Sequence, residues 1–234
     1  HRSTHDDLVH ISVKNHMHGF ENQQAHLQKQ VSFEKAASGF MVADPLTLYD
    51  CCPTSDGASC VILAADHVVR QFTDDPVWLR SSGAGSDRLA LHDRPSITQL
   101  VATQKASKSA YSAAGITATD VDLAEVHDCF TVAEMIATED LGFAESGQGG
   151  MFARDGRGIR NEGSVCINPS GGLKSKGHPL GATGTGQAGE VFKQLRGSVE
   201  SERQVRDAQI GITHNVGGSG ATCAVHVFGR DRNE

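Results

Sequence analysis

Three polar turns contain the residues whose types and spacing could support catalysis. Each turn carries a histidine and lies beside a predicted strand; the turns span residues 127–130, 168–181 and 214–220. In the first turn, the thiol of Cys129 follows the imidazole of His127 by two residues. Imidazoles and thiols can exchange protons near neutral pH. Because α/β proteins assemble sites from loops that follow separate strands, we expect these turns to meet.

Two interpretations of Cys129 are open. A free cysteine that follows a strand is most often a small buried apolar residue. Here the thiol also lies near His127 and just before a predicted helix over 132–141, whose N-terminus would favour the thiolate. With His178 close as well, the functional interpretation is an acid–base thiol. A zinc site that adds Cys166 to these three side chains is the competing chemistry, but the usual paired ligand spacings are missing, and we expect no metal.

The glycines around His178 also have two interpretations. They could allow close packing of a helix on the sheet, or they could bring backbone near a ligand and fix His178 in a tight turn before Pro179. The stretch 184–189 matches a dinucleotide-binding glycine pattern by letter, yet it does not directly follow a strand, so we reject that interpretation. The turn at 214–220 is either a permissive β-hairpin or a set of backbone N–H groups beside His214 that suits an oxyanion.

Strands and helices alternate along most of the chain, which predicts an α/β fold with a mixed sheet. Strands are expected over 58–65, 77–79, 121–126, 164–167, 209–213 and 221–228, the first of them buried. Helices are expected over 96–114, 132–141 and 184–195, with helical spacing also over 31–42. Thr131 and Glu134 have the spacing of a capping box, and Gly115 and Gly142 are placed to end helices.

The composition is that of an ordinary globular protein and argues against several classes of function. Of the 234 residues, 38% are hydrophobic and 21% are charged. The formal net charge of −7 disfavours a nucleic-acid partner, and no apolar run is long enough to span a bilayer. The six cysteines have no CxxC spacing, which indicates a reducing compartment. Half of the histidines fall within residues 1–26; we expect solvated surface residues there and not a metal cluster at His16 and His18.

Four motifs together resemble the C-terminal half of a thiolase. They are His-Asp-Cys-Phe at 127–130, Asn-Pro-Ser-Gly-Gly at 168–172, Gly-His-Pro at 177–179 and the glycine turn at 214–220. The first motif is similar to the sterol carrier protein 2-type thiolases, whereas more common thiolases carry Asn-Glu-Ala-Phe there. By this resemblance, residues 1–50 are the end of the loop domain, 51–70 contain the last strand of the N-terminal half, and 71–234 form the C-terminal thiolase domain. The chain opens with His1 and not with Met, so we expect a fragment or a processed product.

The resemblance implies a five-layered α-β-α-β-α thiolase fold, usually dimeric, of which these residues supply the C-terminal half and part of the loop region. It implies an acyltransferase that cleaves a 3-oxoacyl-CoA with CoA, or that runs the reverse Claisen condensation. The implied partners are acyl-CoA, CoA and a second copy of the chain, with CoA as a substrate and no cofactor. The implied compartment is the mitochondrion or peroxisome in a eukaryote and the cytoplasm in a prokaryote. Acyl length, branching and direction stay open.

The resemblance also implies roles for individual residues. His178 would activate the nucleophilic cysteine and line the oxyanion hole for the thioester oxygen, which His127 would complete. The backbone N–H of Val216 would serve a second oxyanion hole. Common thiolases place their acid–base cysteine where this chain has His214, so the acid–base role would move to Cys129. Two further residues are expected to line the site: Phe130 and His214.

The nucleophile is the largest departure from the thiolase pattern. In thiolases the acylated cysteine lies in the N-terminal half in a Cys-x-Ser-like turn, and none of Cys51, Cys52 and Cys60 has that context. We therefore expect the nucleophilic cysteine upstream of this chain. A non-catalytic acyl-CoA-binding or lipid-transfer scaffold is the alternative, and the presence of an upstream nucleophile separates the two. A decarboxylating 3-oxoacyl synthase is a third hypothesis, over which Cys129 and the loop at 174–181 favour a thiolase.

Overall fold

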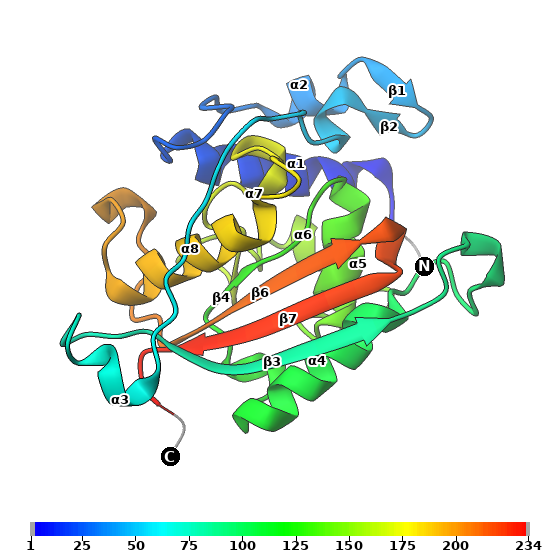
Figure 1. The fold of residues 1–234 in the computed structure, drawn as a ribbon. Coiled ribbons are helices and arrows are strands. Elements are labelled where there is room, and N and C mark those ends of the chain that lie inside the picture. The colour runs from blue at the N-terminus through cyan, green and yellow to red at the C-terminus, as the bar shows by residue number, and fades with distance from the viewer. Residues whose placement is uncertain (1–2, 233–234) are drawn as a thin grey trace.

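A mixed five-stranded sheet organises the computed structural model, which describes residues 3–232. The strands lie in the order β3-β7-β6-β4-β5 (Figure 1). Their bounds are Trp78–Ser86 for β3, Leu123–Glu125 for β4, Cys166–Ile167 for β5, Ile210–Gly217 for β6 and Thr222–Gly229 for β7. Strands β4, β5 and β6 run parallel, whereas β7 pairs antiparallel with both β3 and β6. The carboxyl ends of the three parallel strands therefore lie at one edge of the sheet, where the polar turns emerge.

Helices cover both faces of this sheet and bury a separate apolar cluster on each. Helices α4 (Val101–Ala114) and α5 (Thr131–Asp140) pack on one face, and α8 (Thr183–Arg196) packs on the other (Figure 1). Because successive side chains of a strand point to opposite faces, Val227 joins the cluster on the α4 side and the adjacent Phe228 joins the cluster on the α8 side. Burial of apolar surface stabilises the fold by about 25 cal/mol per Å². Both clusters thus stabilise the platform from which the polar turns emerge.

Helix α4 lies close to β3 because two residues of that strand are glycines. A Cβ atom at Gly83 would lie 2.0 Å from the carbonyl oxygen of Ala106, and a Cβ atom at Gly85 would lie 2.1 Å from that of Ala102. Any larger residue at either position would push the helix away from the sheet. The helix ends at Gly115, which adopts a left-handed φ of 68° as the sequence predicts.

A mostly helical layer covers the edge at which the parallel strands end. Its elements are α1 (His5–Phe20), α2 (Phe33–Ala37), the paired strands β1 (Met41–Ala43) and β2 (Leu46–Thr47), α6 (Gly149–Arg154) and α7 (Gly172–Ser175). Helix α1 contacts α2, α5, α6 and α7 (Figure 1). The remaining short elements are α3 (Asp66–Val69) and 3₁₀ turns at Leu48–Asp50, Leu91–Asp93, Ala118–Asp120, Ser201–Arg203 and Gly218–Gly220.

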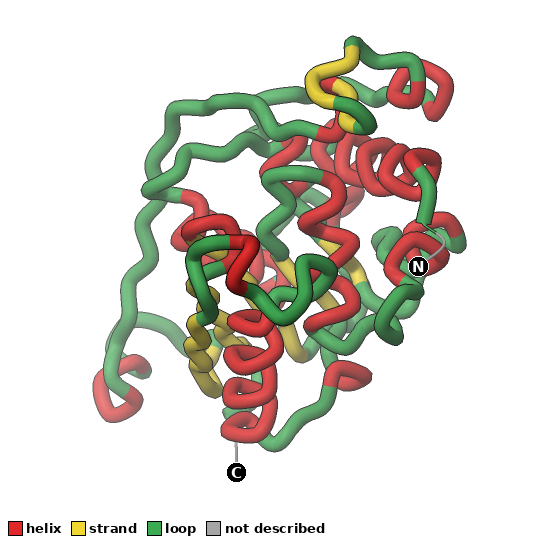
Figure 2. The backbone as a smooth tube through the Cα atoms, turned by 90° about the vertical axis from the view of Figure 1, so that its right-hand side faces the viewer, coloured by secondary structure: helices red, strands yellow, loops and turns green. Residues whose placement is uncertain are grey.

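Residues 58–65 do not form the buried strand that the sequence predicts. They run as an extended segment along the outside of the molecule, from the helical layer toward α3 (Figures 1 and 2). Ile62 is 90% exposed and Leu63 is 73% exposed. The described residues place no strand beside this segment, so its apolar side chains have no sheet on which to pack. The last strand of the N-terminal half, expected within 51–70, is therefore not formed in the described part of the chain.

The other predicted strands and helices are confirmed, with shifted bounds. The short strand expected at 77–79 extends to Ser86, and the helix expected from residue 96 begins at Val101. The helical spacing over 31–42 gives a helix only to Ala37, after which the β1–β2 pair begins. The glycine pattern at 184–189 lies inside α8, which agrees with its rejection as a dinucleotide-binding loop.

The capping box predicted for α5 is wrong. Phe130 is the residue that precedes the first turn, and no side chain caps the helix there. The Thr131 hydroxyl instead donates a hydrogen bond of 2.7 Å to Oδ1 of Asp50. The Glu134 carboxylate is buried and accepts hydrogen bonds from other parts of the fold. Both side chains therefore form tertiary hydrogen bonds and do not cap the helix.

The expectation of solvated histidines is wrong for His16 and His18. They lie on the inner face of α1 and are 4% and 0% exposed. Nε2 of His18 accepts from the backbone N–H of Arg160 at 3.1 Å, so Nδ1 carries the proton and donates to the carbonyl oxygen of Asn168 at 3.0 Å. Burial is the largest cause that lowers the pKa of His16 to about 4, and it lowers that of His18 well below its ordinary value. Both imidazoles are neutral structural groups that anchor α1.

Candidate active site

The three polar turns meet at the carboxyl edge of the sheet, as the sequence predicts. The rings of His127 and His178 pack edge to face, with their centroids 5.0 Å apart and their planes at 88°. The backbone N–H of His127 donates to Nδ1 of His214 at 3.4 Å. One histidine from each turn therefore belongs to a single chain of contacts.

Residues 51–55 connect the first turn to the second. The backbone N–H of Cys52 donates to the carbonyl oxygen of Cys129 at 3.0 Å. The hydroxyl oxygen of Ser55 accepts a hydrogen bond of 3.2 Å from the backbone N–H of His178. Isolated β-bridges reinforce both contacts. This short segment holds the loop of Cys129 and the loop of His178 at a fixed separation.

His178 is half-buried and is held through both its backbone and its ring. The backbone bonds to Ser55, and Nδ1 of the ring lies 2.7 Å from Oγ1 of Thr183. Burial lowers the pKa of the imidazole below its ordinary value, and the positive charge of Lys176 lowers it further. The ring is therefore neutral at pH 7 and can accept a proton.

His127 has an unused hydrogen-bonding atom. Its Nδ1 is buried and has no hydrogen-bond partner among the described residues. Burial, followed by the charge of His178, lowers the pKa of the ring to about 4. A buried polar atom without a partner costs free energy, which a bound ligand oxygen would recover. The neutral ring of His127 therefore keeps hydrogen-bonding capacity that no described residue uses.

His214 lies behind His127 and not at the surface of the site. Its side chain is fully buried, and Nδ1 accepts the backbone hydrogen bond from His127. The ring proton is therefore on Nε2, which lies 2.9 Å from the hydroxyl of Thr103. Burial, with His127 as the second cause, lowers the pKa of His214 to about 3. This neutral ring supports the backbone of the first turn.

Val216 and Phe130 lie at the margins of the site. Val216 is half-buried near the end of β6, where it pairs with Cys223 of β7. The antiparallel pairing of β6 with β7 confirms the hairpin expected around 214–220. Phe130 is 41% exposed at the start of α5. The oxyanion role of the Val216 N–H and the site-lining role of Phe130 stay predictions.

The side chain of Cys129 is half-buried, and its thiol is protonated at neutral pH. Burial is the largest cause that raises its pKa to about 11, and the negative charges of Asp128 and Cys52 add to the effect. The backbone N–H of Phe130 at the start of the helix does favour the thiolate, but desolvation outweighs this contribution, so the pKa is raised overall. At neutral pH the group is a thiol that can donate a proton.

Asp128 is a positioning residue that sequence reasoning passed over. Its buried carboxylate accepts the backbone N–H groups of Leu173 at 2.7 Å and of Lys174 at 3.3 Å, and so ties the first turn to the second. A Cβ atom at Gly172 would lie 2.3 Å from this carboxylate, so the contact requires glycine there. Burial, followed by the charge of Glu134, raises the pKa of Asp128 to about 7. The available signal was an acidic residue between a histidine and a cysteine, directly after a predicted strand.

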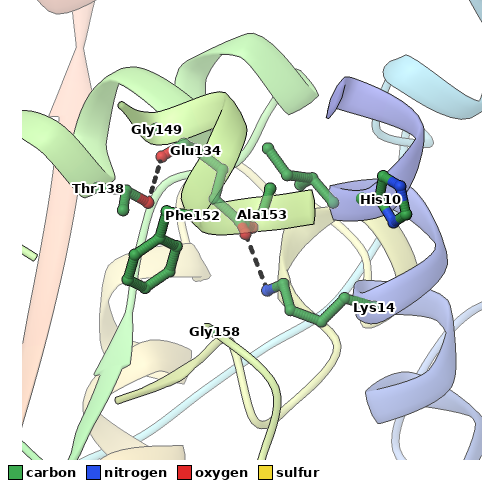
Figure 3. Close-up of a pocket in the computed structure, with 9 residues that line it drawn as sticks. His10, Lys14, Glu134, Thr138, Gly149, Phe152, Ala153 and Gly158 are labelled. Atoms are coloured by element: carbon green, nitrogen blue, oxygen red, sulfur yellow. Dashed lines mark hydrogen bonds and ion pairs between the residues drawn. The ribbon is translucent and has the colours of Figure 1, made fainter. Parts of the chain in front are cut away.

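A buried polar network behind Asp128 links α1 to α5. The amide of Asn15 donates to Asp128 at 2.8 Å and to Glu134 at 2.7 Å, and the amide of Asn168 donates to Glu134 at 2.8 Å. Lys14 pairs with Glu134 at 2.8 Å beside a cavity of about 10 Å³ (Figure 3). This cavity is too small for a substrate, so the network supports the site and does not bind the reactants.

A larger polar cleft opens beside the loop of His178. It has a volume of about 780 Å³ and lies between residues 54–60 and α8. Its charged lining includes Lys176, Lys193 and Glu190. The volume is within the range of about 300–1,000 Å³ that small-molecule sites occupy.

Neither a metal cluster nor a membrane-spanning helix occurs among residues 3–232. No group of three or more His, Cys, Asp or Glu side chains in that range is arranged to hold a metal ion. Cys166, the fourth candidate zinc ligand, is buried within β5. None of the described helices is both long and apolar enough to cross a membrane.

Matches to a protein-family model and to relatives in other organisms show which family the chain belongs to. Residues 83–230 match a family model described as thiolase C-terminal domain-like. The chain belongs to this thiolase family. It is 49% identical over 228 residues to an acetyl-CoA acetyltransferase of Methanothermobacter thermautotrophicus, a match that covers 97% of this chain and 59% of the relative. It is 38% identical over 216 residues to sterol carrier protein 2 of Homo sapiens, covering 90% of this chain and 39% of the relative.

Two solved structures show that the fold is the C-terminal portion of a thiolase fold. The structure of an Ltp2-ChsH2(DUF35) aldolase matches 99% of this chain and 60% of its own, with a TM-score of 0.87 and 22% identity. A monomeric SCP2-thiolase-like protein of Mycobacterium smegmatis matches 96% of this chain and 46% of its own, with a TM-score of 0.72 and 17% identity. The second large sheet of a five-layered thiolase is not among residues 3–232, which form one five-stranded sheet with helices on both faces.

Proposed function

We propose that this chain supplies the acid–base and oxyanion-binding half of a thiolase that acts on 3-oxoacyl-CoA. The reaction is thiolytic cleavage by CoA or the reverse Claisen condensation. The observation that carries the proposal is that the loop of His127 and Cys129 meets the loop of His178 at one sheet edge. Relatives named acetyl-CoA acetyltransferase and benzoylsuccinyl-CoA thiolase subunit support acyl transfer as the chemistry.

In the proposed mechanism, His178 acts first. Its neutral imidazole takes the proton of a nucleophilic cysteine that lies outside the 234 residues. The thiolate attacks the 3-oxo carbonyl carbon, the bond between C2 and C3 breaks, and the acyl group stays on the cysteine as a thioester. The lowered pKa of His178 supports this role, because the base is in its neutral form at neutral pH.

Cys129 donates a proton in the first half of the reaction and recovers one in the second. Its thiol protonates the α-carbon of the departing acyl-CoA enolate. The thiolate of Cys129 then takes the proton of an incoming CoA, whose sulfur attacks the acyl-enzyme and releases the shortened acyl-CoA. The nucleophilic cysteine leaves as a thiolate and recovers its proton from His178. A pKa of about 11 supports this sequence, since the group is protonated before the first step and strongly basic after it.

His127 and the backbone of Val216 stabilise the oxyanions in this proposal. Nδ1 of His127 has no hydrogen-bond partner among residues 3–232, and the proposal assigns the unused hydrogen-bonding capacity of this ring to the thioester oxygen. The N–H of Val216 serves the tetrahedral intermediate on the nucleophile. One hydrogen-bond donor to an oxyanion is worth about 3–4 kcal/mol of transition-state stabilisation.

Acyl-CoA, CoA and a second copy of the chain are the partners that we propose. The competing arrangement is a complex with a different protein. One structural neighbour was solved as an Ltp2-ChsH2(DUF35) aldolase, and one relative is named as a thiolase subunit. Light scattering of the purified full-length protein distinguishes these arrangements, since a homodimer has twice the mass of one chain without any added partner.

A non-catalytic acyl-CoA-binding or lipid-transfer scaffold is the second candidate. It is favoured by the 38% identity to sterol carrier protein 2. Such a scaffold would bind acyl-CoA without consuming it.

A thiolysis assay separates the two candidates. The full-length protein is mixed with CoA and a series of 3-oxoacyl-CoA substrates of increasing chain length, and loss of the 3-oxoacyl-CoA is followed. We expect turnover that depends on both substrates and disappears in Cys129→Ala. Saturable binding of the same substrates without turnover at any chain length would support the scaffold.

A further inference from the structure

Thr183 is placed to decide which nitrogen of His178 carries the proton. It is the first residue of α8, and it is only 2% exposed. Its Oγ1 lies 2.7 Å from Nδ1 of His178 and 3.0 Å from the carbonyl oxygen of Pro179. The hydroxyl is therefore in hydrogen-bond contact with two groups of the same loop.

The single proton of this hydroxyl can serve only one of the two contacts as donor. A carbonyl oxygen has no proton to give, so the bond to Pro179 requires Thr183 to donate. The oxygen of Thr183 is then an acceptor toward His178, which requires a proton on Nδ1. In the neutral ring this leaves Nε2 unprotonated, and no described residue hydrogen-bonds to that atom.

We propose that Thr183 is a positioning residue that fixes His178 in the Nδ1-protonated tautomer and so leaves Nε2 free as the base. The inference deepens the proposed function and rests on His178 acting as a base in it. Many catalytic histidines are oriented by a carboxylate, which also stabilises the charged ring. Here the orienting group is a neutral hydroxyl. It fixes the tautomer of the imidazole but does not stabilise the positively charged ring as a carboxylate would.

The charges around His178 agree with a ring that is kept neutral. The titratable groups whose interactions with it are resolved are Lys176, whose positive charge opposes protonation, and His127, whose ring packs against it. Among residues 3–232, no carboxylate forms an ion pair with His178. A neutral, oriented imidazole is the form that can take a proton from a thiol without first losing one.

Nitrogen-15 NMR of the full-length protein with labelled histidine tests the tautomer directly, in the absence of substrate. The resonances of His178 are assigned by their loss in His178→Gln. We expect the wild type and Thr183→Ser to show a protonated Nδ1 and an unprotonated Nε2. Thr183→Val should show a mixture of both tautomers, and Thr185→Val, a matched control on the same helix, should match the wild type.

Thiolysis kinetics give the second readout. For metal-binding histidines, loss of the orienting hydrogen bond costs about 10- to 100-fold in activity, and we expect the same scale for His178. We expect Thr183→Val to lower kcat by that factor with little change in KM, and Thr183→Ser to restore most of it. A purely structural role would instead lower thermal stability and leave kcat per folded molecule unchanged.

The two proposals fail in different ways. An Nε2-protonated His178 in the wild type, or an unchanged tautomer in Thr183→Val, would overturn the role of Thr183 even in an active enzyme. A wild type with the expected tautomer but no acyl transfer would instead overturn the proposed function. If Thr183→Val does not fold, the wild-type tautomer and the Thr183→Ser variant still decide the question.

Discussion

The sheet edge that carries His127, Cys129 and His178 and the polar network behind it use similar residue types in opposite ways. In the network, the carboxylates of Asp128 and Glu134 are fully buried, and each accepts several hydrogen bonds. At the edge, His127 has a buried nitrogen without a described partner, and Cys129 and His178 are only half-buried. The two regions adjoin, because Asp128 lies between His127 and Cys129.

The difference shows how a reactive edge is kept in place. A group that will bond to substrate must keep hydrogen-bonding capacity free, and an unpartnered group costs free energy in the folded state. The saturated network offsets that cost by fixing the backbone on either side of each reactive residue. We therefore expect substitutions at the edge to change activity and substitutions in the network to change stability.

The largest effect on activity is expected for His178→Ala. This change removes the base and one oxyanion donor, and the donor alone is worth about 3–4 kcal/mol, or roughly 10²–10³ in rate. Formation of the acyl-enzyme should fall by at least that factor in a rapid-quench burst experiment. The melting temperature should stay near that of the wild type, and an unchanged burst would make His178 a structural residue only.

The largest effect on stability is expected for Glu134→Leu. The substitution leaves the buried ammonium of Lys14 and the amides of Asn15 and Asn168 without their shared carboxylate. Removal of one partner of a buried ion pair typically destabilises by about 3–5 kcal/mol. Urea denaturation measures this cost, with exposed Glu145→Leu as the control. Equal midpoints for the two variants would show that the network does not support the fold.

A smaller loss of activity is expected for His214→Ala. His214 is buried and neutral and supports the backbone of His127, so it acts on the site through that residue. Its removal should lower kcat per folded molecule by roughly tenfold, the lower end of the range for groups that orient metal-binding histidines. Cys129→Ala should cost much more under the same conditions. Comparable losses of kcat at normal thermal stability would make His214 a catalytic partner.

The smallest effect is expected in the pH profile. His178 must be neutral to act as base, so kcat/KM falls as pH drops through its pKa, which lies below the ordinary value of about 6.5. Cys129 must be protonated to act as acid, so the alkaline fall comes only near pH 11. Lys176→Met removes a positive charge and should move the acid limb to higher pH by less than about one unit. A shift to lower pH would contradict the assigned charge effect.

The sequence predicts the site better than it predicts the support for the site. The meeting of the three turns follows from parallel strands whose carboxyl ends share an edge. The protonated state of Cys129 could not be predicted, because the helix N-terminus is a local signal whereas burial depends on the whole fold. Glu134 has a local capping pattern, yet tertiary hydrogen bonds from α1 take its carboxylate into the core. The strand expected at 58–65 fails for a similar reason, since a strand needs a neighbour that its own sequence does not specify.

His178 and Cys129 are assigned different proton transfers, and mass spectrometry of the acylated protein separates the two roles. Intact mass spectrometry follows the full-length wild type and Cys129→Ala after mixing with an acyl-CoA, and proteolysis then locates the acyl-cysteine. We predict that, with a 3-oxoacyl-CoA as the acyl-CoA, Cys129→Ala accumulates a stable acyl adduct on a cysteine outside these 234 residues, because water can protonate the released enolate whereas attack by CoA lacks its base. Wild-type turnover in Cys129→Ala, or an acyl group on Cys129 itself in the wild type, would contradict the account.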